Sequence, residues 1–381
     1  MRKLLFITHN FPPQNGGIAV YSLEISRGLK AAGVEICVLT PGNKRDAASD
    51  PFRIIRFHEP GILGKARRSA ICKPILMELK RNRPDLIFLA SLHPYGLFVQ
   101  LAADRAGIPY VVSTHGSDVW RLIRGSSGRG FFAWQGRRTL QKAARVFSVS
   151  RYIAGLAVEL APGIRDPEVI PNGVDHVLFQ PGESTRAYWS SRSGIELEDH
   201  FVICTIAALS RNKNHATALQ AVASLLRRKK RVVYLIAGAG PLEQELRSLA
   251  QRLDILQHVA FLGSVDHPSV ASLLRSSDLF LLPSSKVQGE GFGIAFLEAG
   301  ACGVPAIGGN TGGIPEVIKD GETGFLVNPE DPEEISQRIE LLMDHEELRK
   351  TMGIKARSWA QTHTWESSVR RYLHSMEEIF Q

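Results

Sequence analysis

Short apolar segments alternate with longer amphipathic segments along almost the whole chain. Residues 4–8 are apolar, a helical pattern over residues 18–32 ends at Gly33, and residues 35–40 form the next apolar segment. A glycine just after the last periodic residue is a common helix stop. Strands that are apolar throughout are buried on both faces, as in a parallel sheet with helices on each side. The alternation therefore predicts an α/β fold.

The same alternation restarts in the second half, after a polar stretch at residues 180–200. The expected strands are residues 86–90, 110–114 and 146–149 before this stretch, and residues 201–207, 232–237, 259–262, 279–282 and 306–308 after it. A chain of 381 residues suits two domains of ~100–200 residues each. We predict two doubly wound, Rossmann-like domains facing each other across a cleft, over residues 1–180 and 181–364, with a helix over residues 365–381 packing back on the first.

The composition excludes several other classes of protein. Hydrophobic residues make up 44% of the chain and charged residues 22%, which excludes wholesale disorder. The four cysteines form no C-x-x-C pair, so we expect neither a disulfide framework nor a zinc site, and a reducing cytoplasm suits the chain. The first apolar run ends at Thr8, short of a signal-peptide core, and no run approaches the ~20 residues that cross a bilayer.

Two glycine-rich turns follow predicted strands, where open α/β sheets bind their ligands. Gly16 and Gly17 precede the first helix, whose N-terminal N–H groups suit a phosphate, although a plain tight turn has the same sequence. Gly238 and Gly240 follow residues 232–237, where either a nucleotide approaches the backbone or a simple βα turn forms. The first turn lacks the G-x-G-x-x-G dinucleotide pattern.

Two polar side chains also follow predicted strands. His115 comes directly after residues 110–114, where such sheets place their chemistry, and a simple loop histidine is the alternative. Lys213 lies between a strand and a helix, where a cation suits a diphosphate leaving group, and a solvated loop lysine is the alternative. The basic run at residues 227–231 closes a helix, where cations favour the dipole, so we predict no nucleic-acid partner.

The most informative stretch carries two glutamates. Glu290 and Glu298 are separated by a Gly-Phe-Gly sequence at 291–293, which lets the backbone approach a ligand and opens a helix. We place Glu290 in the loop and Glu298 about two turns into the helix. Such a pair suits a polyhydroxy ligand, although glutamates also occur in capped first turns. The glycine loop at 311–313 suits either a phosphate or a turn.

Taken in order, these stretches resemble the retaining nucleotide-sugar glycosyltransferases of family 4. The matching segments are Phe-Pro-Pro-x-x-Gly-Gly at 11–17, Ser-Thr-His-Gly at 113–116, Pro-Asn-Gly-Val-Asp at 171–175, Phe-Leu-Gly at 261–263, Glu-x7-Glu at 290–298, Glu-Ala-Gly-Ala-Cys-Gly-Val-Pro at 298–305 and Gly-Gly-Ile-Pro-Glu at 312–316. The resemblance covers nearly the whole chain and implies the GT-B fold of two facing Rossmann-like domains.

The resemblance also implies residue roles. Glu290 is expected to contact hydroxyls of the donor sugar, Glu298 the ribose hydroxyls, and His115 the sugar at the reaction centre. Gly17 and Lys213 are expected to hold the diphosphate. The expected catalytic residues are His115, Lys213 and Glu290, and the expected donor-binding residues are Gly16, Gly17, Arg211, Lys213, Gly238, Gly263, Glu290, Gly291, Phe292, Gly293, Ile294 and Glu298.

The chain departs from the family pattern at one position. The family usually has Gly-Arg-Leu where this chain has Ala-Ala-Leu at 207–209, so Ala208 stands at the place of an arginine that helps neutralise the diphosphate. The loss removes a strong bidentate partner. Our hypothesis is that Arg211 and Lys213 share this task.

The resemblance implies transfer of a hexose from a nucleoside-diphosphate sugar to a hydroxyl, with retention of the anomeric configuration. GDP-mannose is slightly favoured as donor, because the N-terminal stretch resembles mannosyltransferases acting on phosphatidylinositol, and UDP-glucose and UDP-N-acetylglucosamine follow. No two aspartates are two positions apart, so no Asp-x-Asp metal motif exists, and we predict no essential metal or cofactor. A front-face reaction assisted by the donor phosphate is expected, because no carboxylate stands out as a nucleophile.

Other functions remain open at this point. A phosphorylase of the same fold needs a pyridoxal lysine and a longer chain. An epimerase acting on a nucleotide sugar is disfavoured by the Glu-x7-Glu pattern. A non-catalytic sugar-nucleotide or membrane-binding protein is the alternative from another class, and release of free nucleoside diphosphate distinguishes it from the enzyme.

The charge of the chain is divided unevenly between its halves. Residues 1–180 carry 25 Lys+Arg and 13 Asp+Glu, a net charge of +12, and the remaining 21 and 25 give −4. In the GT-B fold the first half binds the acceptor, and basic residues gather at 65–83 and 121–145. We therefore expect a lipid-linked or glycan acceptor and peripheral binding to the anionic inner face of the cytoplasmic membrane, with a solvated basic surface as the alternative.

Overall fold

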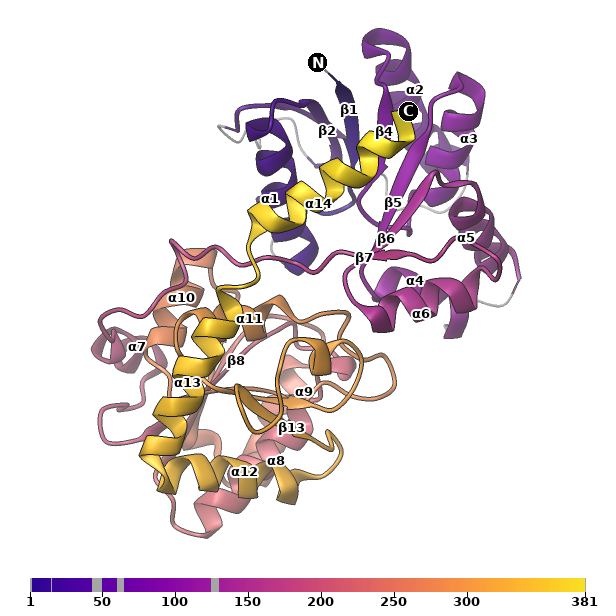
Figure 1. The fold of residues 1–381 in the computed structure, drawn as a ribbon. Coiled ribbons are helices and arrows are strands. Elements are labelled where there is room, and N and C mark those ends of the chain that lie inside the picture. The colour runs from indigo at the N-terminus through magenta and orange to yellow at the C-terminus, as the bar shows by residue number, and fades with distance from the viewer. Residues whose placement is uncertain (1, 15, 43–49, 60–64, 125–129, 381) are drawn as a thin grey trace. The chain divides into compact units, whose positions relative to one another are not determined.

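The computed structural model describes all residues except 1, 15, 43–49, 60–64, 125–129 and 381 (Figure 1). Contacts divide the chain into two units, Met1–Asn172 with Trp365–Gln381, and Gly173–Thr364. We expected the division after residue 180, but it comes earlier. The reason is that the backbone N–H of Val174 donates to the carbonyl of His363, 3.1 Å away, within the second unit.

Seven parallel strands form the sheet of the first unit. They are β1 (Lys3–Ile7), β2 (Glu35–Pro41), β3 (Arg53–Phe57), β4 (Leu86–Leu89), β5 (Tyr110–Thr114), β6 (Arg145–Ser148) and β7 (Glu168–Val169), in the order β3-β2-β1-β4-β5-β6-β7. The sequence did not predict β3, in which arginines interrupt the apolar run, or β7, which has only two residues.

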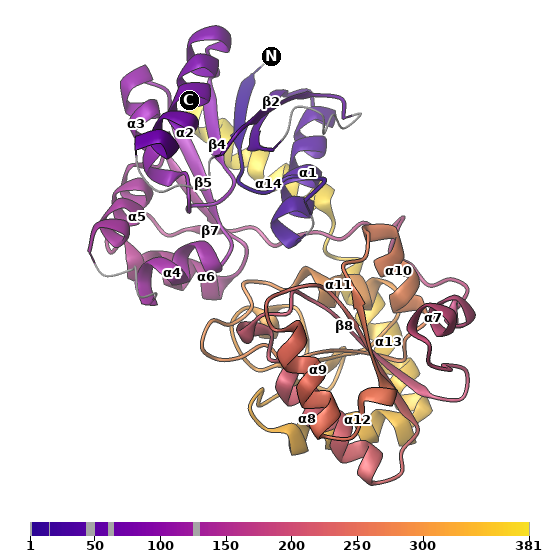
Figure 2. The ribbon, with the colours of Figure 1, turned by 180° about the vertical axis from the view of Figure 1, so that it is seen from behind.

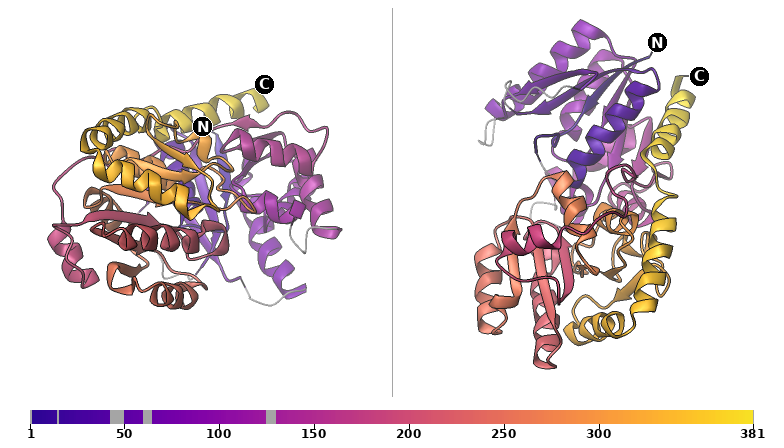
Figure 3. Two further views of the ribbon diagram at one scale, coloured as in Figure 1. Left: turned by 90° about the horizontal axis from the view of Figure 1, so that it is seen from below. Right: turned by 90° about the vertical axis from the view of Figure 1, so that its left-hand side faces the viewer.

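The helices of the first unit are α1 (Gly17–Ala31), α2 (Lys65–Asn82), α3 (Gly96–Ala106), α4 (Ser117–Arg124), α5 (Phe131–Lys142), α6 (Arg151–Leu160) and α14 (Trp365–Glu377). The C-terminal helix α14, yellow in Figures 1 and 3, packs on α1. The buried hydroxyls of Tyr21 and Tyr372 lie 2.9 Å apart, and Val369 fills the space over Gly28, where any larger side chain would overlap it. Thus α14 completes the first unit, although the whole second unit lies between α14 and the rest of the first unit in the sequence.

The second unit has a sheet of six parallel strands. They are β8 (Phe201–Ile206), β9 (Val232–Ala237), β10 (Val259–Gly263), β11 (Leu279–Leu282), β12 (Ala306–Gly309) and β13 (Gly324–Val327), in the order β10-β9-β8-β11-β12-β13. Its helices are α7 (Arg186–Ser193), α8 (His215–Arg227), α9 (Glu243–Arg252), α10 (His267–Arg275), α11 (Ile294–Ala301), α12 (Pro332–Asp344) and α13 (Glu346–Ala360), and Figure 2 shows this unit from behind.

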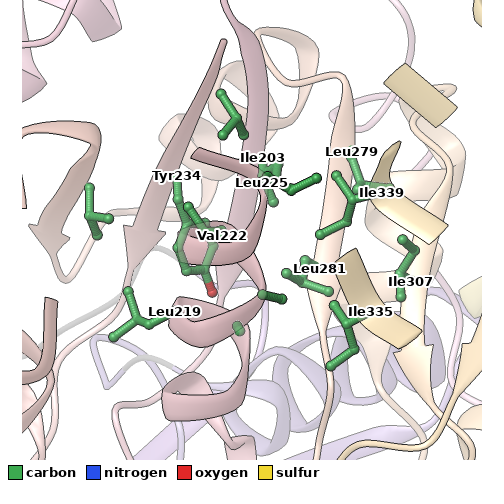
Figure 4. Close-up of a cluster of buried hydrophobic side chains, with 14 of the residues drawn as sticks. Ile203, Leu219, Val222, Leu225, Tyr234, Leu279, Leu281, Ile307, Ile335 and Ile339 are labelled. Atoms are coloured by element: carbon green, nitrogen blue, oxygen red, sulfur yellow. The ribbon is translucent and has the colours of Figure 1, made fainter. Parts of the chain in front are cut away.

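The core of the second unit lies between its sheet and the helices α8 and α12. Figure 4 shows Leu219, Val222 and Leu225 of α8 beside the strand residues Tyr234 and Leu281, and all five are buried. Full burial of one such aliphatic side chain stabilises a fold by about 1.5–3 kcal/mol. This packing fixes the sheet, and the sheet in turn fixes the loops that leave its strands.

Strand order reverses once in each sheet, and this determines where a ligand is expected to bind. The neighbours at the reversal are β1 and β4 in the first unit, and β8 and β11 in the second. Successive connections leave these two strands in opposite directions, so a crevice forms beyond their carboxyl ends. The segments that follow these strands are therefore the candidate site segments of each unit.

One detail of the predicted helix at the glutamates needs correction. Glu298 is the fifth residue of α11, just over one turn from its start and not two turns, because the helix begins at Ile294. Elsewhere, within the ranges that the structure describes, no helix is long and apolar enough to cross a membrane.

Candidate active site

Lys213 and Glu290 come together at the reversal point of the second sheet. Lys213 ends a short 3₁₀ turn, Arg211–Lys213, after β8, and Glu290 lies in the loop after β11. Their side chains form an ion pair and are both 18% exposed. The backbone N–H of Ser285 donates to the carbonyl of Asn212, 2.8 Å away, which joins the two loops. The structure thus brings together two of the three predicted catalytic residues.

The glycine loop at 311–313 supports Glu290 from the other side. The N–H of Gly313 donates to the carbonyl of Glu290 at 2.8 Å. Gly312 has a φ of +62°, and a side chain there would overlap the backbone of Glu290. The Gly313 N–H is therefore already used for this bond, so the loop serves first to hold Glu290, and the predicted phosphate role does not extend to that N–H.

Gly293 allows the turn that starts α11. It has a φ of +88°, in the left-handed region that glycine favours, and a side chain there would overlap Phe296. The helix it opens carries Glu298, whose side chain is only 9% exposed. Glu298 Oε1 lies 3.0 Å from Nε2 of His267, the first residue of α10. The Gly-Phe-Gly sequence therefore places one glutamate in the loop and the other on the helix that follows.

Gly238 holds neighbouring loops of the second unit together. Its N–H donates to the carbonyl of Gly263 at 2.8 Å, and a side chain at Gly238 would overlap the carbonyl of Ala207. The segments after β8, β9 and β10 consequently meet at one edge of the sheet. Close approach of backbone to backbone is enough to require this glycine, so no nucleotide is needed to explain it. Arg211 is exposed at the same edge of the sheet.

In the first unit, His115 comes directly after β5 and is half-buried. Its ring lies 4.3 Å from the ring of Tyr21, centre to centre, in an edge-to-face arrangement. Burial lowers the pKa of His115 to about 4, and the nearby charge of Asp118 only partly opposes this. Nε2 of His115 and Nδ1 of His9 are buried with no hydrogen-bond partner among the described atoms. The ring is therefore a neutral group with an unused nitrogen.

Asp118 fixes the backbone around His115. Its Oδ1 accepts the N–H groups of His115 and Gly116 at 3.0 and 2.9 Å, and its Oδ2 accepts the N–H of Leu92 at 3.0 Å and the Ser91 hydroxyl at 3.3 Å. One buried carboxylate thereby connects the loops after β4 and β5. Asp118 and His9 were not predicted from the sequence, although Asp118 lies in the same Thr-His-Gly-Ser-Asp segment as His115.

Gly16 and Gly17 lie at the start of α1. Gly16 has a φ of +130°, and no side chain among the described residues caps the first N–H groups of the helix. The loop between β1 and α1 is only partly described, because residue 15 lies outside the described residues. The structure places these two glycines at the carboxyl end of β1, the reversal point of the first sheet.

A cavity of about 640 Å³ lies elsewhere in the first unit. It is lined by residues at the start of β6 and by α14, including Arg145, Arg165 and His374. Strand β6 begins at Arg145, so this cavity is at the amino end of the strand. Open α/β sheets bind their ligands at the opposite ends, and we do not assign the cavity to the candidate site.

Two family patterns match the chain. The family described as glycosyl transferases group 1 matches residues 189–359, and the glycosyl transferase 4-like domain matches residues 16–173. The N-acetyl-alpha-D-glucosaminyl L-malate synthase of Bacillus anthracis is 31% identical over 360 residues, which cover 91% of this chain and 89% of that protein. The chain belongs to the group 1 glycosyltransferases. The resemblance to family 4 is thereby confirmed.

A mannosyltransferase and several solved structures are also similar to the chain. The GDP-mannose-dependent alpha-(1-6)-phosphatidylinositol monomannoside mannosyltransferase of Mycolicibacterium smegmatis is 29% identical over 368 residues, covering 94% of this chain and 93% of that protein. Among solved structures, sucrose-phosphate synthase from Thermosynechococcus elongatus matches with a TM-score of 0.86 at 19% identity, covering 100% and 99% of the two chains. Anabaena HepE in complex with UDP-glucose matches with a TM-score of 0.84 at 19% identity, covering 99% and 100%. These likenesses confirm the GT-B fold.

Proposed function

We propose that this chain transfers a hexose from a nucleoside-diphosphate sugar to a hydroxyl of a lipid-linked or glycan acceptor, with retention of configuration, in cell-envelope glycan or glycolipid synthesis. The observation that carries the proposal is the meeting of Lys213 and Glu290 at the carboxyl ends of β8 and β11, with Glu298 on the next helix. A cation beside carboxylates suits a ligand that has both a diphosphate and hydroxyls.

The donor in this proposal is GDP-mannose first, followed by UDP-glucose and UDP-N-acetylglucosamine. The Mycolicibacterium relative, which by its name uses GDP-mannose, supports this order. The Bacillus relative carries an N-acetylglucosaminyl product in its name, and the HepE structure holds UDP-glucose, so both support the other two donors.

In the proposed mechanism, the bond between the sugar C1 and the diphosphate oxygen breaks while the acceptor oxygen bonds to C1 on the same face. The acceptor proton passes to the departing phosphate oxygen. Lys213 and Arg211 offset the charge that builds on the diphosphate, which is the main catalytic contribution of fixed cations. Glu290 and the neutral His115 accept hydrogen bonds from sugar hydroxyls, and Glu298 accepts one from the ribose.

The test is incubation of the protein with GDP-mannose, UDP-glucose and UDP-N-acetylglucosamine, each with phosphatidylinositol vesicles as acceptor. We expect release of free nucleoside diphosphate from one donor, unchanged by EDTA, with a product whose anomeric configuration by NMR equals that of the donor. An altered sugar on an intact nucleotide would favour the epimerase instead. Binding of a donor without any product would favour a non-catalytic protein.

A surface of exposed aromatic and basic side chains on the first unit supports the lipid part of the proposal. Phe131, Phe132 and Trp134 of α5 are 53%, 42% and 50% exposed. The rings of Phe131 and Trp134 stack with centres 6.0 Å apart, and the guanidinium of Arg138 lies 5.6 Å from the Trp134 ring centre. Exposed aromatic rings among basic residues suit an anionic lipid interface. The side chains of Lys65, Arg67 and Arg68, in the other predicted basic group, lie outside the described residues.

Co-sedimentation with vesicles tests this surface. We expect binding to vesicles that contain phosphatidylinositol, weaker binding to phosphatidylcholine vesicles, and loss of binding in a Phe131→Ser, Trp134→Ser double variant. Tyr188→Ser, which removes an exposed aromatic ring from the second unit, is the matched control and should bind normally. Binding that does not depend on anionic lipid, or that survives the double variant, would contradict membrane docking through α5.

A further inference from the structure

Glu298 has a histidine partner that lies outside every motif noted in the sequence. Nε2 of His267 lies 3.0 Å from Oε1 of Glu298. An ionised carboxylate only accepts hydrogen bonds, so the ring nitrogen carries the hydrogen and donates it. His267 begins α10, and α10 packs beside α11, the helix that carries Glu298 (Figures 1 and 2).

The histidine ring packs against Phe179, and the start of its helix is capped. The buried ring of Phe179 meets it edge to face, with centres 4.9 Å apart. Asp266 caps α10 by accepting the N–H of Ser269 at 2.9 Å, which fixes the start of the helix. The ring can therefore hold the carboxylate in one orientation.

The burial of the two partners is unequal. The Glu298 side chain is 9% exposed and that of His267 is 36% exposed. A carboxylate this buried needs a hydrogen-bond donor, since desolvation otherwise disfavours its charged form. Within the described part of the chain, Oε1 is the side-chain oxygen of Glu298 that makes a hydrogen bond. The carboxylate thus has one oxygen engaged by protein and a second oxygen available to a ligand.

The position of the pair matches the expected nucleotide. Strand β10 ends at Gly263, whose carbonyl accepts the N–H of Gly238, so the segment leading to His267 leaves the same edge of the sheet as the other ligand loops. We propose that His267 is a positioning residue for the donor nucleotide. It holds Oε1 of Glu298, so that Oε2 accepts a hydrogen bond from a ribose hydroxyl. This inference rests on the proposed function.

The experiment measures how strongly the protein distinguishes ribose from deoxyribose. Isothermal titration calorimetry gives the Kd of GDP, UDP and ADP and of their 2′-deoxy counterparts, for the full chain. For the nucleotide that binds best, the unmodified protein should prefer the ribose form about tenfold, the value of one charge-assisted hydrogen bond. In His267→Phe and His267→Leu the preference should fall below about threefold, through weaker binding of the ribose form.

Two further variants separate positioning from a merely structural role. His267→Gln should restore most of the ribose preference, because its amide N–H can replace that of the ring. In a Glu298→Gln background, adding His267→Phe should change the preference no further, because both changes act on one contact. His345→Gln, which replaces an exposed histidine before α13, is the matched control and should behave as the unmodified protein. With the donor sugar, KM should rise in His267→Phe while kcat changes less than about twofold, since only nucleotide binding is affected.

The possible failures can be told apart. If the unmodified protein binds none of the three nucleotides, the proposed function is wrong and this inference with it. If it binds one of them but the ribose preference is absent, or is kept in both His267→Phe and His267→Leu, the inference is overturned and the proposed function stands. If either His267→Phe or His267→Leu is unfolded at the assay temperature, the comparison uses the other variant.

Discussion

The candidate residues of the two units differ in how their polar atoms are satisfied. In the second unit, Lys213 forms an ion pair with Glu290, and Nε2 of His267 lies 3.0 Å from Oε1 of Glu298. In the first unit, burial keeps His115 neutral, and its Nε2 has no partner among the described atoms. The second unit therefore offers a cation, Lys213, that can exchange its carboxylate partner for a ligand, and the first offers a ring nitrogen with no hydrogen-bond partner among the described atoms.

This difference agrees with the separate roles proposed above for His115 and Lys213. The His115 ring hydrogen-bonds the backbone of Ala90, whose N–H is already given to Ile7, so the ring donates through Nδ1 to the Ala90 carbonyl. Nε2 is then an acceptor suited to a sugar hydroxyl. The paired charges of the second unit instead suit a diphosphate, which can take the place of Glu290 beside Lys213. The predictions that follow test this division, beginning with the largest effect.

Removal of the Lys213 cation should have the largest effect. In Lys213→Ala we expect kcat/KM to fall ~10²–10³-fold, measured with whichever of the three proposed donors releases nucleoside diphosphate, because a fixed group that offsets charge in the transition state is lost. Lys350→Ala is the control, since Lys350 is an exposed lysine that pairs with Glu346 at 2.9 Å. A loss of less than about threefold in Lys213→Ala would show that the paired charges of the second unit do not serve the diphosphate.

The sequence predicted most of the fold, but not the pairing that this prediction tests. Apolar periodicity was sufficient for β5, β9 and β11, whose predicted and observed bounds agree. Lys213 and Glu290 were both named from motifs, yet their contact depends on β8 lying beside β11, and strand order is not local information. The contacts of Asp118 with Leu92 and of His267 with Glu298 were missed for the same reason, because these partners lie 26 and 31 residues apart in the chain.

A buried histidine of the second unit allows the comparison to be extended to stability. His215 is 2% exposed, and burial lowers its pKa to about 4. Between pH 6.5 and 4 the unfolded chain binds a proton that the folded chain does not, so stability rises with pH across this window. We expect the contribution of the neutral His215 ring to the unfolding free energy to be fully present above pH 6.5. About 3 kcal/mol of unfolding free energy should be lost as the pH falls to 4.

Urea unfolding of the unmodified protein and of His215→Gln, at a series of pH values, measures this effect. Nε2 of His215 lies 3.1 Å from the carbonyl of Ala208, and a glutamine amide can keep that bond without titrating. The variant should therefore lose less stability in acid. His345→Gln, at an exposed site, should retain the full pH dependence, and equal slopes in all three proteins would contradict the assignment to His215.

In the first unit, a change at Asp118 should have an intermediate effect. In the unmodified protein, both carboxylate oxygens of Asp118 accept backbone N–H groups. In Asp118→Asn, the amide NH2 cannot accept, so one backbone N–H loses its hydrogen bond and the unfolding free energy should fall by ~2 kcal/mol. Activity should fall as well, because the His115 backbone loses its support. Asp104→Asn is the control, an exposed carboxylate that pairs with Lys142 at 2.8 Å and should change stability little. Thermal unfolding followed by circular dichroism separates the two variants, and equal melting temperatures would argue against a supporting role for Asp118.

The smallest expected effect concerns the arginine that stands two residues before Lys213. If Arg211 shares the work of the missing family arginine, Arg211→Ala should weaken donor binding about tenfold, the value of one charge-assisted contact. Arg231→Ala, at an exposed arginine 3.4 Å from Asp199, should not change it.

Restoring an arginine at the family position makes this test stronger. Ala208 is exposed, so an arginine fits there without disturbing the core. In the Arg211→Ala background, Ala208→Arg should return donor affinity toward that of the unmodified protein, because either arginine can reach the same diphosphate. Unchanged donor binding in Arg211→Ala would mean that Lys213 alone offsets the charge, and donor binding by the second unit would then depend on the Lys213–Glu290 ion pair even more than the comparison with the first unit implies.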